Sequence, residues 1–144
     1  MSPEEPPRGP SALAELRQAL ASGAPRAVPA GCIVSGVEPL DVALCGGVPA
    51  GRLVELCGSA GRMTLALSLA ASALRRGACA FLDAVDGLDV DVAEQVGVDL
   101  SRLLWARVVS AEDALRGADL LLRAGGFALL VLYLCGARPP RLGP

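Results

Sequence analysis

The feature of this sequence that most limits its fold is a regular alternation of strand-like and helix-like segments after residue 50. Runs at 52–57, 79–83, 103–109 and 127–134 are rich in the aliphatic and aromatic residues that favour strands. The intervening runs at 64–75, 89–96 and 110–124 carry apolar residues at helical spacing. Strands that alternate with helices form a parallel sheet covered by helices on both faces. The sequence therefore predicts an α/β domain with about four core strands.

Several boundaries of these elements are marked by local signals. Ser110 followed by Asp113 forms a capping box at the start of the helix at 110–124, and a pair of glycines ends that helix. Asp89 is predicted to cap the helix that follows it. The strand at 127–134 is apolar throughout, which predicts burial on both of its faces.

The residues outside this alternation divide the chain further. Residues 1–10 are predicted to be a disordered tail, 11–22 a separate N-terminal amphipathic helix, 23–31 a linker, 32–136 the core and 137–144 a flexible tail. The apolar stripe of the N-terminal helix is Leu13, Leu16 and Leu20. This stripe is expected to dock either on the domain or in the groove of a partner, and the sequence does not separate the two.

Composition excludes several kinds of site. Acidic residues number 15 and basic residues 13, so no general positive field draws the chain to nucleic acid. There is no histidine, and every basic residue is arginine, which excludes histidine triads and catalytic lysines. The five cysteines are odd in number and none forms a C-x-x-C pair, which predicts reduced, mostly buried thiols.

No metal site and no membrane segment are predicted. Asp83, Asp86, Asp89 and Asp91 are close in sequence, but helix capping and the helix dipole explain Asp89 and Asp91 more simply. The N-terminus lacks the pattern of a secretory signal, and the longest apolar run is about half the length of a membrane-spanning helix. A cytoplasmic protein is expected.

A glycine turn stands between the first strand and the first helix of the core, as in a P-loop, where backbone amides hold a phosphate. The turn consists of Gly58, Ser59, Ala60, Gly61, Arg62, Met63 and Thr64. It departs from the G-x-x-x-x-G-K-[ST] pattern because its glycines are two residues closer together. Arg62 stands in place of the lysine and Met63 in place of the hydroxyl residue, and Thr64 offers a hydroxyl one position late.

Two stretches resemble the RecA-like P-loop ATPase superfamily. Residues 34–58 (VSGVEPLDVALCGGVPAGRLVELCG) resemble the opening of the RecA core, and residues 78–104 (ACAFLDAVDGLDVDVAEQVGVDLSRLL) resemble its next segment. The resemblance covers about residues 33–134. Three features resemble most the small accessory proteins of the ImuA/SulA type: the N-terminal helix at 11–22, the G-G-x-P-x-G-R-L entry, and residues 121–132 (LLRAGGFALLVL). The resemblance implies a RecA-like parallel β-sheet core flanked by helices.

The resemblance also places the family's catalytic positions on this sequence. The phosphate-binding lysine falls on Arg62, the magnesium-binding threonine on Met63, the catalytic glutamate on Val85 and the Walker B aspartate on Tyr133. Tyr133 is expected to fill the space of the missing magnesium site. Because all four chemical groups are replaced, the site is expected to be degenerate and unable to hydrolyse ATP. The protein is therefore not expected to be an enzyme.

A further expectation concerns the sheet. The strand that follows Walker B in the family lies between the Walker B and P-loop strands, and this sequence stops before it, as in a C-terminally truncated core. The sheet is therefore expected either to be completed by a partner or to pair its first and fourth strands directly.

The leading hypothesis is a non-catalytic accessory protein that acts by protein–protein interaction in bacterial DNA repair, within SOS translesion synthesis. Its partner would be a translesion polymerase-associated protein, a RecA-type recombinase, or a second copy joined through an unpaired sheet edge. Trp105 is expected in the core, with a partner anchor as the alternative, and direct nucleic-acid binding is expected to be weak. No cofactor is expected. The alternative function is weak binding of ATP and magnesium at 58–64 by a RecA-related ATPase, and a third possibility is a remnant without activity.

Overall fold

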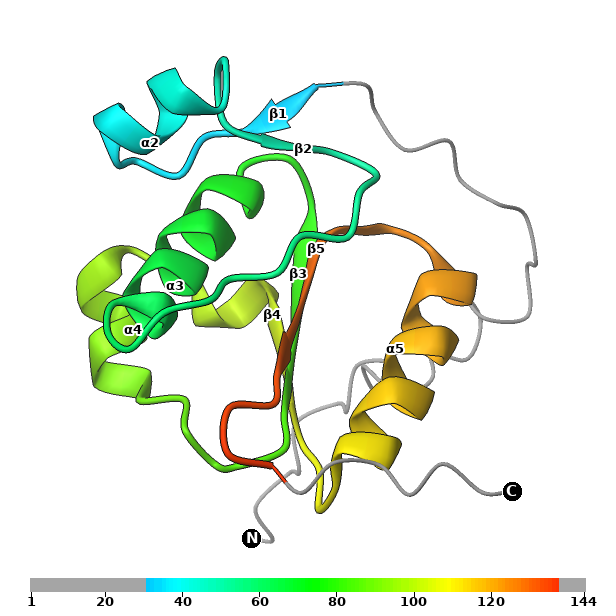
Figure 1. The fold of residues 1–144 in the computed structure, drawn as a ribbon. Coiled ribbons are helices and arrows are strands. Elements are labelled where there is room, and N and C mark those ends of the chain that lie inside the picture. Colours follow the sequence, from blue (N-terminus) through cyan, green and yellow to red (C-terminus); the bar gives the residue numbers. More distant parts are fainter. Residues whose placement is uncertain (1–30, 138–144) are drawn as a thin grey trace, which may run out of the picture.

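The main element of the protein is a three-stranded parallel sheet, seen in a computed structural model that describes residues 31–137 (Figure 1). Its strands are β3 (Ala78–Asp83), β4 (Leu103–Arg107) and β5 (Phe127–Tyr133), in the order β4-β3-β5. Both neighbours pair in parallel with the central strand β3, and Phe81 lies opposite Trp105 on one side and Val131 on the other. This architecture confirms the predicted α/β class.

Helices cover both faces of this sheet (Figure 1). Helices α3 (Arg62–Ala73) and α4 (Val90–Val96) lie on one face, and α5 (Ala111–Ala124) lies on the other. A short 3₁₀ helix, Leu100–Arg102, leads into β4. Each connection between parallel strands thus contains a helix, as parallel pairing requires.

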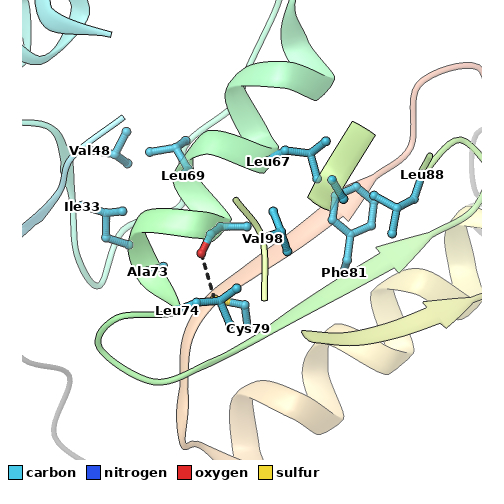
Figure 2. Close-up of a cluster of buried hydrophobic side chains, with 12 residues drawn as sticks. Ile33, Val48, Leu67, Leu69, Ala73, Leu74, Cys79, Phe81, Leu88 and Val98 are labelled. Atoms are coloured by element: carbon cyan, nitrogen blue, oxygen red, sulfur yellow. Dashed lines mark hydrogen bonds between the residues drawn. The ribbon is translucent and has the colours of Figure 1, made fainter. Parts of the chain in front are cut away.

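The core is divided by the alternation of side chains along β3. Cys79 and Phe81 point toward α3 and pack with Leu67 and Ala70, and Figure 2 shows the larger of these side chains. Ala80 and Leu82 point to the other face, where a second cluster contains Ala114, Ala118 and Leu121 of α5. Phe81 and Leu67 are fully buried, and each such side chain stabilises the fold by about 2 kcal/mol.

A small antiparallel unit lies beside α3. Strands β1 (Cys32–Ile33) and β2 (Val48–Pro49) pair with each other, and α2 (Glu38–Ala43) lies between them in the chain. Ile33 and Val48 are buried in the cluster that contains Cys79, Phe81 and Leu67, called the α3-side cluster below, and this joins the unit to the core.

Two predictions about strands were wrong. Residues 52–57 do not form a strand: they have no backbone hydrogen bond to another described residue, and Leu53 is 95% exposed. Strand β5 is half-buried at every position, not buried on both faces, whereas β3 is the deeply buried strand. Both differences have one cause, which is that residues 52–57 and β5 do not pair with each other. Without this pairing residues 52–57 have no strand partner, and β5 pairs only with β3 among the described residues.

The predicted helix starts were more accurate. The Ser110 hydroxyl accepts a hydrogen bond from the Asp113 amide at 3.1 Å, and Asp89 accepts from the amides of Asp91 and Val92. Helix α3 begins at Arg62, two positions before the expected start at residue 64. The predicted N-terminal helix with Leu13, Leu16 and Leu20, and most of the predicted C-terminal tail, lie outside the described residues.

The prediction of mostly buried cysteines was also wrong. Cys79 is buried, Cys32 is half-buried, and the remaining three are exposed: Cys45, Cys57 and Cys135. All five are free thiols. Burial raises the pKa of the Cys79 thiol to about 11, so this thiol is inert at neutral pH. Across residues 31–137, no helix combines the length and apolar character needed to cross a membrane.

Candidate functional site

The glycine turn at 58–61 lies at the start of α3, at the same end of the sheet where β3 and β5 finish (Figure 1). Gly61 occupies the N-cap position with a φ of 77°, a left-handed conformation that glycine adopts without strain. Ser59, Ala60 and Thr64 are exposed, whereas Met63 is half-buried and packs against the α3-side cluster. The carboxyl ends of parallel strands are where α/β proteins bind their ligands.

The first turn of α3 differs from those of the other helices on the sheet. No side chain among residues 31–137 caps α3, and its first turn holds no acidic residue. Helices α4 and α5 are instead capped by Asp89 and Ser110 and carry acidic residues in their first turns. The amides of α3 and the positive end of its dipole are therefore left for an anion.

Arg62 is the cationic side chain of this loop. Its Nη1 donates to the carbonyl of Gly58, and its Nη2 donates to the Sγ of Cys135 at 2.8 Å. The guanidinium thus lies between the start of the loop and the residues that follow β5. A guanidinium at this position can bind phosphate in a bidentate fashion.

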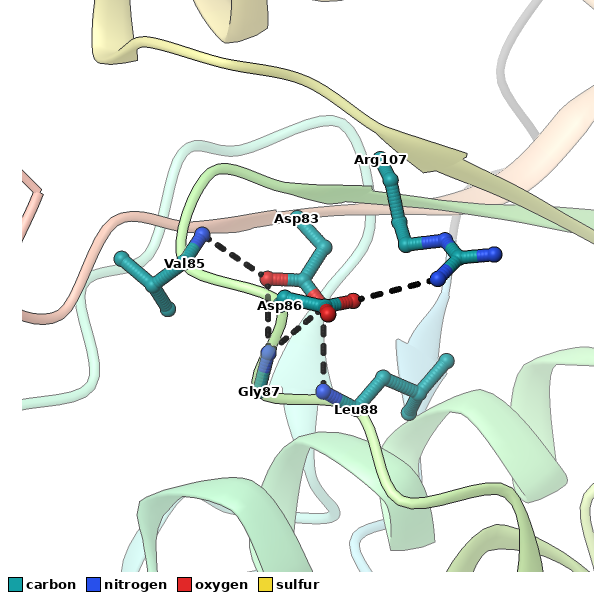
Figure 3. A network of polar contacts seen from close by, with 6 residues as sticks. All are labelled: Asp83, Val85, Asp86, Gly87, Leu88 and Arg107. Atoms are coloured by element: carbon teal, nitrogen blue, oxygen red, sulfur yellow. Dashed lines mark hydrogen bonds and ion pairs between the residues drawn. The ribbon is translucent and has the colours of Figure 1, made fainter.

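The turn after β3 is built around one buried carboxylate (Figure 3). Asp83 accepts hydrogen bonds from the amides of Val85, Gly87 and Leu88 at 2.9–3.1 Å. Burial acts to raise the pKa of Asp83, but the bonds from Leu88, Gly87 and Val85 outweigh it and hold the pKa below its usual value. The Asp83 carboxylate is therefore a structural group that organises the turn.

The two residues at which the resemblance places replaced catalytic carboxylates, Val85 and Tyr133, lie around this turn. Val85 donates its amide to Asp83 and offers no acid or base of its own. Tyr133, at the end of β5, packs its ring against Phe81 with centroids 6.0 Å apart. A Cβ on Gly87 would lie 2.6 Å from the Tyr133 Cε1, so the ring also lies directly against the turn. Whether it fills a former magnesium site stays a prediction.

Trp105 lies on β4 and is half-buried, and it packs against the α3-side cluster. The guanidinium of Arg107 lies 4.8 Å from the centre of its ring, and Arg107 also pairs with Asp86 at 3.6 Å. The indole Nε1 is buried and has no hydrogen-bond partner among the described residues. Trp105 is thus partly a core residue, and its role as a partner anchor stays a prediction.

The described residues offer little to a metal ion. Across residues 31–137 no three His, Cys, Asp or Glu side chains come together as metal ligands. Near the loop, Asp83 is committed to backbone amides and Asp86 faces Arg107 on the surface. The chemistry available at the loop is therefore anion binding by amides and by Arg62.

Comparison with known proteins identifies the relatives of this chain. Residues 18–142 match the RecA N-terminal domain. Protein RecA of Amycolatopsis mediterranei is 43% identical over 117 residues, which cover 78% of this chain and 34% of that protein. Protein RecA of a Nocardioides species is 46% identical over 113 residues, covering 76% of this chain and 32% of that protein. Protein RecA of Leifsonia xyli is 42% identical over 123 residues, which cover 83% of this chain and 34% of that protein.

This chain belongs to the RecA family. It spans about a third of the length of these relatives. The membership confirms the RecA-like superfamily inferred from residues 34–58 and 78–104. It contradicts the expectation that the chain is not an enzyme, because RecA is an ATPase and the match extends over most of the chain. The family finding outweighs the argument from four replaced residues.

Sequence reasoning missed two of the residues that organise this end of the sheet. The sequence suggests Asp83 only as a possible metal ligand, although an aspartate at a strand end with a glycine four positions later is a signal for a turn held by its carboxylate. Cys135 had no signal at all, because its contact with Arg62 joins residues 73 positions apart.

Proposed function

We propose that this chain is a RecA-family nucleotide-binding protein of DNA repair and recombination, and that the 58–64 loop binds the phosphates of ATP. The observation that carries the proposal is the uncapped first turn of α3, with no acidic residue and with Arg62 as its first residue. The relatives named Protein RecA support the family setting.

The loop would bind phosphate through three contributions. The amides of the first turn of α3 donate hydrogen bonds, the helix dipole favours negative charge, and Arg62 supplies a full positive charge. The loop is shorter than the usual P-loop and has no lysine, so a weaker interaction is expected. Val85 cannot activate water, so turnover of bound ATP is expected to be slow.

Calorimetry with ATP and magnesium tests this proposal. The wild-type protein should bind, and Arg62→Ala should weaken the affinity about tenfold through loss of a charge-assisted contact. Arg75→Ala is the matched control, because Arg75 is an exposed arginine just beyond the far end of α3 and should leave the affinity unchanged. Absence of any binding heat at millimolar ATP would refute the proposal.

The open edge of β5 favours a second function, binding of a protein partner. Seven uncharged residues form β5, and the edge away from β3 has no strand partner among residues 31–137. Such an edge accepts a strand from another chain. An accessory role of the ImuA/SulA type in translesion synthesis would use this edge, with a RecA-type recombinase or a polymerase-associated protein as partner.

Amide hydrogen exchange tests the second function. Addition of a RecA-type recombinase should slow exchange in residues 127–133 if the edge is used, while α5 exchange stays unchanged. Equal exchange in β5 with and without the recombinase argues against that partner. Addition of single-stranded DNA in parallel tests the expectation of weak nucleic-acid binding, for which the relatives give no support.

A further inference from the structure

The side chain of Arg62 connects two parts of the molecule that are far apart in sequence. Its Nη1 donates to the carbonyl of Gly58, the first residue of the loop. Its Nη2 donates to the Sγ of Cys135, two residues beyond β5. Both terminal nitrogens of the guanidinium therefore already have acceptors within the protein.

This arrangement matters because Arg62 has no substitute at the loop. It is the one basic residue between positions 53 and 74. The contacts with Gly58 and Cys135 use one N–H of each terminal nitrogen and fix the direction of the guanidinium, so an anion at the first turn of α3 gains the whole guanidinium only if these contacts are rearranged. A ligand that must first displace an internal contact binds with an affinity reduced by the fraction of molecules in which the contact is open.

We propose that the contact between Arg62 and Cys135 is an autoinhibitory latch on the 58–64 loop. The inference rests on the proposed function, since it concerns access of a phosphate to that loop. A thiol sulfur is a weak hydrogen-bond acceptor, whereas a phosphate oxygen is a strong and charged one. The latch therefore opens when a polyphosphate reaches the loop, and it discriminates against weaker anions.

The affinities of the variants for ATP with magnesium show whether the contact between Arg62 and Cys135 opposes binding. Cys135→Ala removes the acceptor and should tighten binding about fivefold, the effect of one hydrogen bond. Cys135→Ser keeps an acceptor and should return the affinity toward that of the wild type. Cys45→Ala is the matched control, because Cys45 is also exposed but lies in the turn between α2 and β2. Unchanged or weaker binding by Cys135→Ala overturns the latch.

A second measurement needs no ligand. Denaturant unfolding of Arg62→Ala, Cys135→Ala and the double variant forms a double-mutant cycle. The latch predicts that the two single shifts in midpoint do not add, whereas additive shifts overturn it.

Failure of the proposed function gives a different pattern. In that case the wild-type protein and the Cys135 and Arg62 variants all fail alike to bind ATP. A non-additive cycle would then reveal only a structural contact, and the latch would be rejected together with the ATP site.

Discussion

Two connections in this protein lead from a strand into a helix of the same sheet face, one from β3 to α4 and one from β2 to α3, and they are built in opposite ways. The turn from β3 to α4 is organised by the buried carboxylate of Asp83 and by the cap at Asp89. The segment from residue 51 to α3 is exposed except at the half-buried Leu56, and as far as residue 60 it has no backbone–backbone hydrogen bond to another described residue. The Arg62 side chain holds the end of this segment through the carbonyl of Gly58. The first connection uses its amides within the turn, whereas the amides of the second have no backbone partner among residues 31–137.

This difference separates the residues that stabilise the fold from the residues that are able to bind a ligand. A turn whose donors are all used by the protein stabilises the domain but has little to offer a ligand. A helix start without a cap contributes less to stability and more to recognition. The comparison therefore predicts that changes in the Asp83 turn alter mainly stability, whereas changes near the loop alter mainly binding.

The largest effect is expected from Asp83→Ala. Removal of the carboxylate leaves the amides of Val85, Gly87 and Leu88 without their acceptor, and should lower the free energy of unfolding by about 3 kcal/mol. Denaturant titration measures the change. Asp86→Ala is the control, since Asp86 makes only an exposed ion pair and should cost less than about 0.5 kcal/mol. Equal effects of the two variants would contradict the role given to Asp83.

The same carboxylate gives the turn a pH dependence. The pKa of Asp83 is lower in the folded state than its usual value, so its stabilisation is present above the unfolded pKa and is lost as pH falls through the folded pKa. Asp41 and Asp99 have lowered pKa values as well and contribute to the same acid region. Asp83→Asn should therefore flatten, without abolishing, the loss of stability in acid. A pH series of thermal unfolding curves that is identical for both proteins would rule this out.

A smaller effect is expected from Gly87→Ala. The added Cβ would meet the Tyr133 ring at 2.6 Å, so the ring or the turn must shift, at a cost of about 1–2 kcal/mol. In a Tyr133→Leu background the same substitution should cost clearly less, because the obstructing ring carbon is gone. An equal cost in both backgrounds would place the strain elsewhere in the turn. Denaturant unfolding of the four proteins measures it.

The smallest effect is expected from Leu53→Ser, in the segment before the loop. Leu53 is 95% exposed, so its replacement should change the free energy of unfolding by less than about 0.5 kcal/mol. Leu56→Ser is the contrast, because Leu56 packs against the α3-side cluster and should cost more. A large loss from Leu53→Ser would show that this segment is covered in solution.

The features that could be predicted are those that depend on residues a few positions away in the sequence. The caps at Ser110 and Asp89 were predictable because each side chain bonds to amides two or three positions ahead. The segment at 52–57 was not, because its pattern is that of a strand but strand formation depends on a distant edge. Burial of β5 was overestimated for the same reason, since apolar side chains are buried only where other elements cover them.

The candidate site shows the same division. The 58–64 loop was found from its glycines, and its position at the start of a helix was correct. The contact that holds Arg62 against Cys135 was not predictable, because it joins residues 73 positions apart. The resemblance predicts four replaced catalytic positions, and from them the sequence predicts loss of enzyme activity. The prediction that the chain is not an enzyme was wrong, since single positions carry less weight than similarity over most of the chain.

The strand order of the sheet has a consequence for the time course of folding. Of the three strands of this sheet, the central strand β3 is synthesised first, and its two neighbours begin about 25 and 50 residues after it begins, so no adjacent hairpin can start the sheet. On the ribosome, a nascent chain can close the β3–β4 pair while the opposite edge of β3 waits for residues 127–133. Until those residues emerge, Phe81 and Leu82 lack their β5 neighbours, and this interval is when the nascent domain depends most on protection from aggregation.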